Sequence, residues 1–150
     1  MTQVEVQLAT LERALPRQPE MLRWVSATLA SEAKSGEVSI RIVDEAESRE
    51  LNRTYRSKDR PTNVLSFAAE LPAEVEPRLL GDLVLCAPIV AAEAAAQGKT
   101  VRAHWAHLIV HGTLHLLGYD HERASDARRM EARETSILTG LGFPNPYEQS

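Results

Sequence analysis

The spacing of the histidines constrains the fold of this chain more than any other feature of its sequence. Four of the five histidines lie between positions 107 and 121. His111 and His115 are four positions apart, so on an α-helix their imidazoles would lie on one face, separated by a rise of about 6 Å. Two imidazoles placed in this way can bind one metal ion at about 2.1 Å each. The sequence therefore predicts a helix over residues 102–117 that carries a chelating histidine pair.

The residues that follow this helix indicate a third ligand. His107 has the same spacing from His111, but His107 and His115 would lie about 12 Å apart along the helix axis, too far for one ion to bind both. Gly118 favours a left-handed turn that would bring residues 119–121 back toward His115. We therefore predict that His111, His115 and His121 bind the metal. Three protein ligands leave a fourth position for water, which is typical of a catalytic zinc site.

Other residues near the histidines allow more than one interpretation. The histidines could simply be satisfied polar groups on a packed helix, and we interpret His104 and His107 as packing or supporting groups rather than ligands. Asp120 could orient an imidazole or assist the metal-bound water, but an aspartate beside a Gly-Tyr turn is also ordinary turn chemistry. Gly112 stands where metalloproteases of the His-Glu-x-x-His type have their glutamate base, which disfavours peptide hydrolysis by that route.

The remaining pattern predicts an α+β fold, with a small mixed sheet of about four strands covered by helices and a zincin-like histidine helix. Predicted strands cover residues 4–8, 38–42, 63–68 and 79–87, and predicted helices cover residues 21–33, 44–55, 88–97, 102–117 and 125–141. Asp44 with Glu47 should form a capping box, Gly36 should end the helix over 21–33, and the last helix should be capped at both ends. Residues 71–78, with two prolines, should form an exposed connection.

Size, charge and cysteine content limit the class of protein. A chain of 150 residues is expected to form one domain, 1–150, and no apolar run approaches the ~18 residues that cross a membrane. We expect a cytoplasmic protein, since the first residues do not resemble a signal peptide. Cys86, the only cysteine, has apolar neighbours and should be a core residue. The net charge of −4 means that any contact with nucleic acid must use a local basic patch.

Such a patch precedes the strand predicted over 63–68. Arg53, Arg56, Lys58 and Arg60 place four cations close together in an acidic chain. A cluster of this kind suits a phosphate backbone, although cations at the end of a helix also complement its dipole. In combination with a metal site, contact with phosphate is the favoured interpretation.

These segments carry a resemblance to a known family. Residues 111–121, HGTLHLLGYDH, are similar to the signature of the YbeY family, the bacterial metal-dependent endoribonucleases of ribosomal RNA maturation. Residues 55–67, YRSKDRPTNVLSF, resemble its second motif, and residues 80–86 and 103–107 resemble it as well. The resemblance implies an α+β fold, one zinc ion held by His111, His115 and His121, and an arginine at Arg56 that acts in RNA cleavage. It also implies work on the small ribosomal subunit, in 3′-end maturation of its RNA and in quality control, and suggests ribosomal proteins and an assembly GTPase as partners.

A mechanism follows as a hypothesis. Zinc-activated water would attack a phosphodiester of single-stranded RNA, and Arg56 would stabilise the charge that develops on the phosphoryl oxygens. A rival mechanism uses the RNA 2′-hydroxyl as the nucleophile, with the metal and Asp120 in support. Two other functions stay open at this point: a zinc peptidase, and a ribosome-assembly factor without catalysis in which zinc is structural and residues 53–60 bind RNA.

Overall fold

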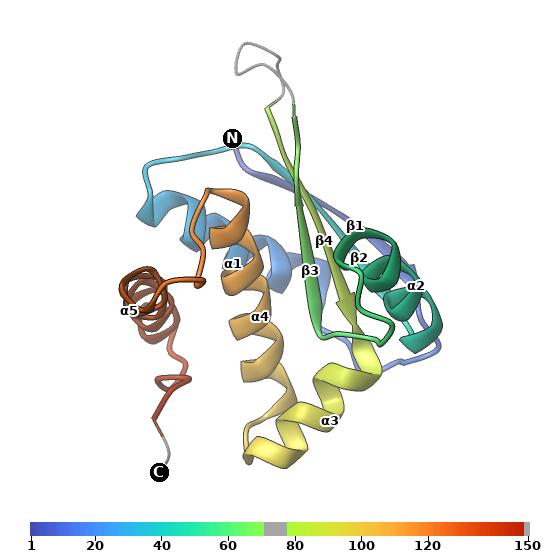
Figure 1. Cartoon of the computed structure of the whole chain (residues 1–150). Helices are drawn as coiled ribbons and strands as arrows, with labels where there is room; N and C mark the ends of the chain where they lie inside the picture. Colours follow the sequence, from blue (N-terminus) through green and yellow to red (C-terminus); the bar gives the residue numbers. More distant parts are fainter. Residues whose placement is uncertain (71–77, 149–150) are drawn as a thin grey trace.

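The computed structural model describes residues 1–70 and 78–148, which form an α+β fold (Figure 1). The predicted connection over 71–78 falls almost wholly outside these residues. In chain order the elements are β1 (Gln3–Ala9), α1 (Gln18–Ser31), β2 (Glu37–Val43), α2 (Glu45–Arg56), β3 (Val64–Ala68), β4 (Leu79–Cys86), α3 (Ala87–Gln97), α4 (Val101–Leu116) and α5 (Ala124–Gly140). Among the helices of the described residues, none combines the length and apolar character needed to cross a membrane.

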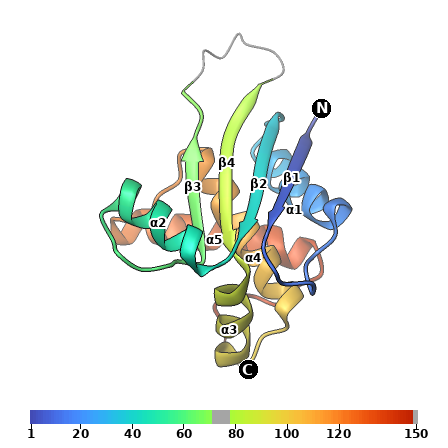
Figure 2. The ribbon, with the colours of Figure 1, turned by 90° about the vertical axis from the view of Figure 1, so that its right-hand side faces the viewer.

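The four strands form one mixed sheet, which confirms the predicted small mixed sheet, and their order is β1-β2-β4-β3. β1, β2 and β4 are parallel, with Val38 paired to Val4 on one side and to Gly81 on the other. β3 runs antiparallel to β4 and forms one edge of the sheet, opposite β1 (Figure 2). Because β3 is an edge strand, no further strand of the described residues lies beyond it on that side of the sheet.

Helices cover both faces of the sheet. α1 and α4 pack on one face, α5 packs outside them, and α2 covers the other face (Figure 1). Successive side chains of β4 point to opposite faces of the sheet, and Leu83 and Leu85 belong to the large core beneath α4. Val84 and Cys86 point to the smaller core beneath α2. Cys86 is fully buried, which confirms its predicted core position, and burial raises the pKa of its thiol.

α4 is the helix around which the larger core is built, and its approach to the sheet depends on a glycine. Thr100 caps its first turn by accepting a hydrogen bond from the Ala103 amide at 3.1 Å. At Gly112, an added Cβ would lie 2.8 Å from Leu83 Cδ2 and 3.2 Å from Ser66 Oγ. The absence of a side chain therefore lets α4 lie directly on the sheet, where the Ser66 hydroxyl donates to the Gly112 carbonyl at 3.3 Å.

The ends of α1 differ from the prediction. The helix begins at Gln18 rather than Met21, because Pro19 suits the first turn and the Glu20 carboxylate accepts from the Arg17 backbone amide at 3.2 Å. It ends at Ser31, five residues before Gly36, which was expected to end it, and Ala33 beyond the helix adopts the left-handed conformation with φ 55°.

The predicted capping box at Asp44 and Glu47 is wrong. Asp44 does occupy the N-cap of α2, but its carboxylate accepts hydrogen bonds from the Thr10 hydroxyl and the Leu11 amide. Glu47 instead forms an ion pair with Arg41 of β2. Partners from distant parts of the chain have thus replaced the local cap. The last helix likewise begins without a side-chain cap, at Ala124 after Arg123.

Candidate metal centre and nucleic-acid interface

One face of α4 and the turn that follows it bring three imidazoles together. His111 Nε2 and His115 Nε2 lie 3.1 Å apart, and the ring of His121 lies 5.7 Å from that of His111 and 5.0 Å from that of His115. One nitrogen from each of the three rings lies within 4.8 Å of the other two. The structure therefore assembles the three residues that the histidine spacing singled out.

Gly118 makes this arrangement possible. Its φ of +101° turns the chain back at the end of α4, and the Tyr119 amide donates to the Leu114 carbonyl at 3.1 Å. The Tyr119 carbonyl then accepts a hydrogen bond from His115 Nδ1 at 2.8 Å. One turn thus orients His115 and carries His121 to the other side of the same space.

Hydrogen bonding leaves the facing nitrogens free for a cation. A carbonyl and a carboxylate can only accept, so the proton of His115 lies on Nδ1, toward Tyr119, and that of His111 lies on Nδ1, 3.2 Å from Glu134 Oε1. Both Nε2 atoms then present lone pairs to each other at 3.1 Å. Two nitrogens bound to one tetrahedral zinc ion would be about 3.4 Å apart. The donor set therefore fits zinc in chemistry and in spacing.

The surroundings of His115 keep its imidazole neutral, with a single proton. Burial, the neighbouring charge of His111, and more weakly those of His121 and Arg56, lower the pKa of His115 to about 4, against the effect of its bond to Tyr119. The lone pair on its Nε2 atom is thus available near neutral pH.

Glu134 of α5 is a supporting residue that the sequence analysis missed. Its side chain is 1% exposed, and its carboxylate accepts hydrogen bonds from His107 Nε2 at 2.6 Å, from His111 Nδ1 at 3.2 Å and from the Tyr147 hydroxyl at 2.9 Å. A carboxylate behind a liganding imidazole fixes its tautomer and its orientation. His107 therefore helps to hold the carboxylate that orients His111, in agreement with its interpretation as a supporting group.

Its partners keep Glu134 charged although it is buried. Burial alone would raise the pKa of this carboxyl, but the hydrogen bonds and charges of His107 and His111 lower it to about 2. The signal in the sequence was the position of Glu134 on the buried side of α5, together with Met130, Ile137 and Leu138. A glutamate in such a position is seldom buried without a partner.

Asp120 lies in an exposed turn, whereas Gly112 is packed against the sheet. Asp120 is exposed, and its carboxylate accepts from the Glu122 amide at 3.3 Å, which is a turn contact. Gly112 faces Leu83 and Ser66 at distances that leave no room for a side chain. A glutamate base of the metalloprotease type therefore cannot be accommodated there without displacing α4 from the sheet.

The basic cluster lies at the end of α2 and in the loop before β3. Arg53 is paired with Glu50 on the same helix, whereas Arg56, Lys58 and Arg60 are exposed and form no ion pair within residues 1–70 and 78–148. The ring of Tyr55, beside Arg56, packs edge-on against Phe67 of β3 at 5.2 Å. The end of α2 thus packs against the edge strand β3, which α4 also contacts.

Comparison with known proteins decides the family. The family model described as Endoribonuclease YbeY matches residues 5–142. The chain belongs to the YbeY endoribonuclease family. Its fold is also similar to the solution structure of TM1509 from Thermotoga maritima, with a TM-score of 0.63 and 26% identity over 97% of this chain and 96% of that one.

Membership of the YbeY family gives the site a reaction class. It implies an endoribonuclease role in ribosomal RNA maturation, and hence a nuclease of the hydrolase class. The family is metal-dependent in general, and His111, His115 and His121 form a candidate site for the ion in this chain.

Two buried polar residues of α2, also missed from the sequence, hold the basic loop of this YbeY chain. The Ser48 hydroxyl accepts from the Thr62 amide at 2.9 Å and donates to the Thr62 carbonyl at 3.0 Å. The Asn52 side chain donates to the Arg60 carbonyl at 2.9 Å. Ser48 and Asn52 are 2% and 3% exposed. The loop that carries Lys58 and Arg60 is therefore fixed to the helix that carries Arg56.

Proposed function

We propose that this chain is a zinc-dependent endoribonuclease that prefers single-stranded RNA and acts in the cytoplasm, in 3′-end maturation of small-subunit ribosomal RNA and in ribosome quality control. We further propose one zinc ion per chain, and small-subunit ribosomal proteins and an assembly GTPase as partners. The observation that carries the proposal is the pair of facing Nε2 atoms of His111 and His115, 3.1 Å apart, in a chain of an endoribonuclease family.

Each residue has a defined task in this proposal. A bound zinc ion would supply an activated water and offset negative charge on the phosphate. Glu134 and the Tyr119 carbonyl keep the protons of His111 and His115 on Nδ1. Arg56 binds the phosphoryl oxygens through its planar guanidinium, with Arg53, Lys58 and Arg60 along the flanking backbone. Asp120, exposed in the turn next to His121, accepts the proton of the attacking nucleophile in this proposal.

The products identify the nucleophile. If the RNA 2′-hydroxyl attacks, the upstream fragment ends in a 2′,3′-cyclic phosphate. Attack by water leaves no cyclic end. The peptidase alternative finds no support, because the lack of space at Gly112 excludes the glutamate base that it would need at that position.

The test compares the zinc-loaded chain with His111→Ala and Arg56→Ala on a small-subunit ribosomal RNA fragment that includes the 3′ end. His111→Ala should lose zinc and cleavage. Arg56→Ala should keep zinc and lose cleavage by about 10²–10³-fold, the usual cost of removing one group that stabilises transition-state charge. Arg23→Ala is the matched control, since Arg23 is also an exposed arginine on a helix.

Three outcomes would contradict the proposal. Equal cleavage by the parent and by His111→Ala would mean that the activity does not come from this site. RNA binding without cleavage at full zinc occupancy would favour an assembly factor with a structural ion. Full activity of Arg56→Ala would remove the arginine from the mechanism.

A further inference from the structure

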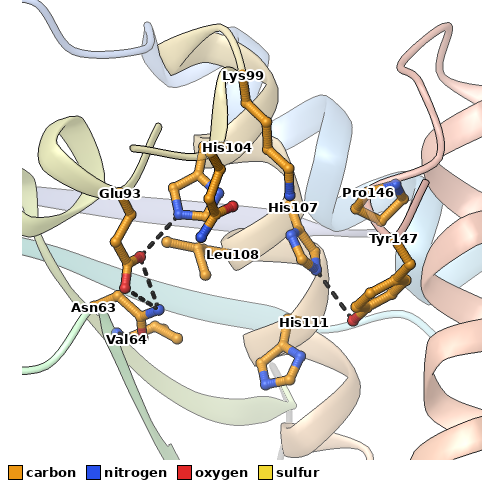
Figure 3. Close-up of a pocket in the computed structure, with 11 residues that line it drawn as sticks. Asn63, Val64, Glu93, Lys99, His104, His107, Leu108, His111, Pro146 and Tyr147 are labelled. Carbon is orange, nitrogen blue, oxygen red and sulfur yellow. Dashed lines mark hydrogen bonds and ion pairs between the residues drawn. The ribbon is translucent and has the colours of Figure 1, made fainter. Parts of the chain in front are cut away.

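A cavity opens beside the candidate metal centre, and His111 lines it. It has a volume of about 350 Å³ and lies between the start of β3, the helices α3 and α4, and the C-terminal tail (Figure 3). The residues that matter for its chemistry are Lys99, His107, Leu108, His111, Pro146 and Tyr147. His111 belongs both to this wall and to the three converging imidazoles, so a molecule in the cavity would adjoin a bound metal.

The tail provides a rigid aromatic wall. The Tyr147 hydroxyl donates to Glu134 at 2.9 Å, and the Tyr147 ring packs edge-on against His107 with centroids 5.5 Å apart. The residue is nevertheless 45% exposed. An aromatic ring that is fixed at its polar end and open elsewhere is suited to stacking against a planar group.

Lys99 provides a cation that lacks a protein partner. It is half-buried, and its side chain forms no ion pair or hydrogen bond within residues 1–70 and 78–148. Burial lowers the pKa of Lys99, against the opposing effect of the charges of Glu134 and Glu93. Its side chain reaches toward His107 in the cavity (Figure 3). A half-buried ammonium in this situation favours a ligand that offers an acceptor oxygen or nitrogen.

The remaining wall disfavours a phosphate as that ligand. The carboxylates of Glu93, in the wall, and Glu134, behind His107, would repel a phosphate. Val64, Leu108 and Pro146 add apolar surface. The cavity also falls within the volume of about 300–1,000 Å³ usual for small organic ligands. The required molecule is planar, partly apolar and rich in acceptors.

We propose that this cavity binds an unpaired nucleobase of the RNA, that of the nucleotide next to the scissile phosphate. The base stacks on Tyr147 and accepts a hydrogen bond from Lys99, while its phosphate lies at the imidazole cluster near Arg56. This inference rests on the proposed function. It gives the preference for single strands a structural reason, because a base that enters the cavity cannot remain paired.

The first test removes the base and leaves the backbone intact. After the cleavage position is mapped on a single-stranded oligonucleotide, kcat/KM is compared with that for the same oligonucleotide carrying an abasic ribose beside the scissile phosphate. The parent chain should cleave the abasic substrate about 5- to 160-fold less efficiently, the range expected for one stacked base. Equal cleavage of the two substrates by the parent would overturn the inference.

Variants assign this discrimination to the cavity. Tyr147→Leu and Lys99→Met should lose efficiency on the intact substrate and little on the abasic one, so that the ratio falls toward one. Tyr147→Phe retains the ring without its bond to Glu134 and should keep most of the discrimination. Lys34→Met, at an exposed lysine on another loop, is the charge-matched control. Equal losses on both substrates would mean a general structural effect and would contradict the inference.

A second test does not depend on cleavage. The four ribonucleoside 5′-monophosphates and ribose 5-phosphate are titrated separately into the zinc-loaded chain, and the NMR signals of Tyr147 and Lys99 are followed. At least one nucleotide should shift both signals at concentrations where ribose 5-phosphate shifts neither. This result without any RNA cleavage would retain the base site and reject the proposed nuclease. A response as strong to ribose 5-phosphate, or no response to any nucleotide, would reject the base site itself.

Discussion

Replacement of Glu134 by glutamine should weaken zinc binding by reversing the tautomer of His111. Glu134 Oε2 receives hydrogen bonds from both His107 and Tyr147, whereas Oε1 receives only that of His111. In Glu134→Gln the single amide oxygen should therefore take the Oε2 position. The amide NH₂ then faces His111 Nδ1, where it can only donate. Nδ1 must accept in turn, so the proton moves to Nε2, the atom that would bind the metal.

The expected loss is 10- to 100-fold in zinc affinity, the usual range for removal of a partner behind a liganding imidazole, or about 1.4 to 2.8 kcal/mol. Affinity is measured at fixed pH by competition with a chromophoric chelator. The tautomer of His111 is read in parallel from the ¹⁵N shifts of the imidazole in the metal-free chain.

Glu93→Gln provides the matched control for this experiment. Glu93 is also a carboxylate bonded to a histidine of α4, His104, at 2.9 Å, but within the described residues it contacts none of the three metal-site imidazoles. This variant should leave the zinc affinity unchanged. If Glu134→Gln folds and binds zinc within about threefold of the parent, or if His111 keeps its proton on Nδ1, the reasoning about the supporting carboxylate is refuted.

Three further predictions concern the fold and the basic loop. Gly112→Ala should lower the free energy of unfolding by about 1 kcal/mol in urea denaturation, because overpacking against Leu83 outweighs the gain in helix propensity. Gly140→Ala is the control: an added Cβ there meets nothing within 4 Å, so the free energy of unfolding should rise by a few tenths of a kcal/mol. A stabilised Gly112→Ala would contradict this account. Asn52→Ala should cost about 0.5–1.5 kcal/mol by removing the hydrogen bond to the Arg60 carbonyl, and should weaken RNA binding in fluorescence anisotropy without changing zinc affinity. Burial lowers the pKa of His104 below its ordinary 6.5, although its bond to Glu93 raises it. Below about pH 6.5 the unfolded chain therefore binds a proton that the folded chain does not, and the free energy of unfolding decreases as the pH is lowered. His104→Gln should make that decrease shallower between about pH 7 and pH 5, and parallel curves for the two chains would rule out this contribution.

The parts of the structure that could be predicted from sequence are those fixed by local spacing. In β2 the fully buried Val38, Ile40 and Ile42 alternate with half-buried polar residues, and that period of two identifies the strand. His111 and His115 are placed by one turn of helix, and His121 by a turn at Gly118. These relations need no knowledge of the rest of the fold.

Contacts between distant segments could not be predicted in this way. Glu134 meets His107 and His111 from another helix, and no periodicity indicates which helices pack together. The same limit explains the error at Asp44, since the capping signal is local, but the competing donors Thr10 and Leu11 lie just after β1. The tertiary partners prevailed because they occupy the carboxylate that the cap would have used.

Glu134 connects the two halves of the proposed site. Its carboxylate receives His111 on the side of the imidazole cluster and Tyr147 on the side of the cavity, so one buried group orients a metal ligand and fixes the aromatic wall. The variants separate these tasks: Tyr147→Leu leaves the bond to His111 and should spare zinc affinity while abolishing discrimination against an abasic substrate. Glu134→Gln should lower zinc affinity and yet keep Tyr147 bonded through the amide oxygen. Opposite patterns in these two variants require two neighbouring sites that share a support, whereas parallel losses would make the region a single structural unit.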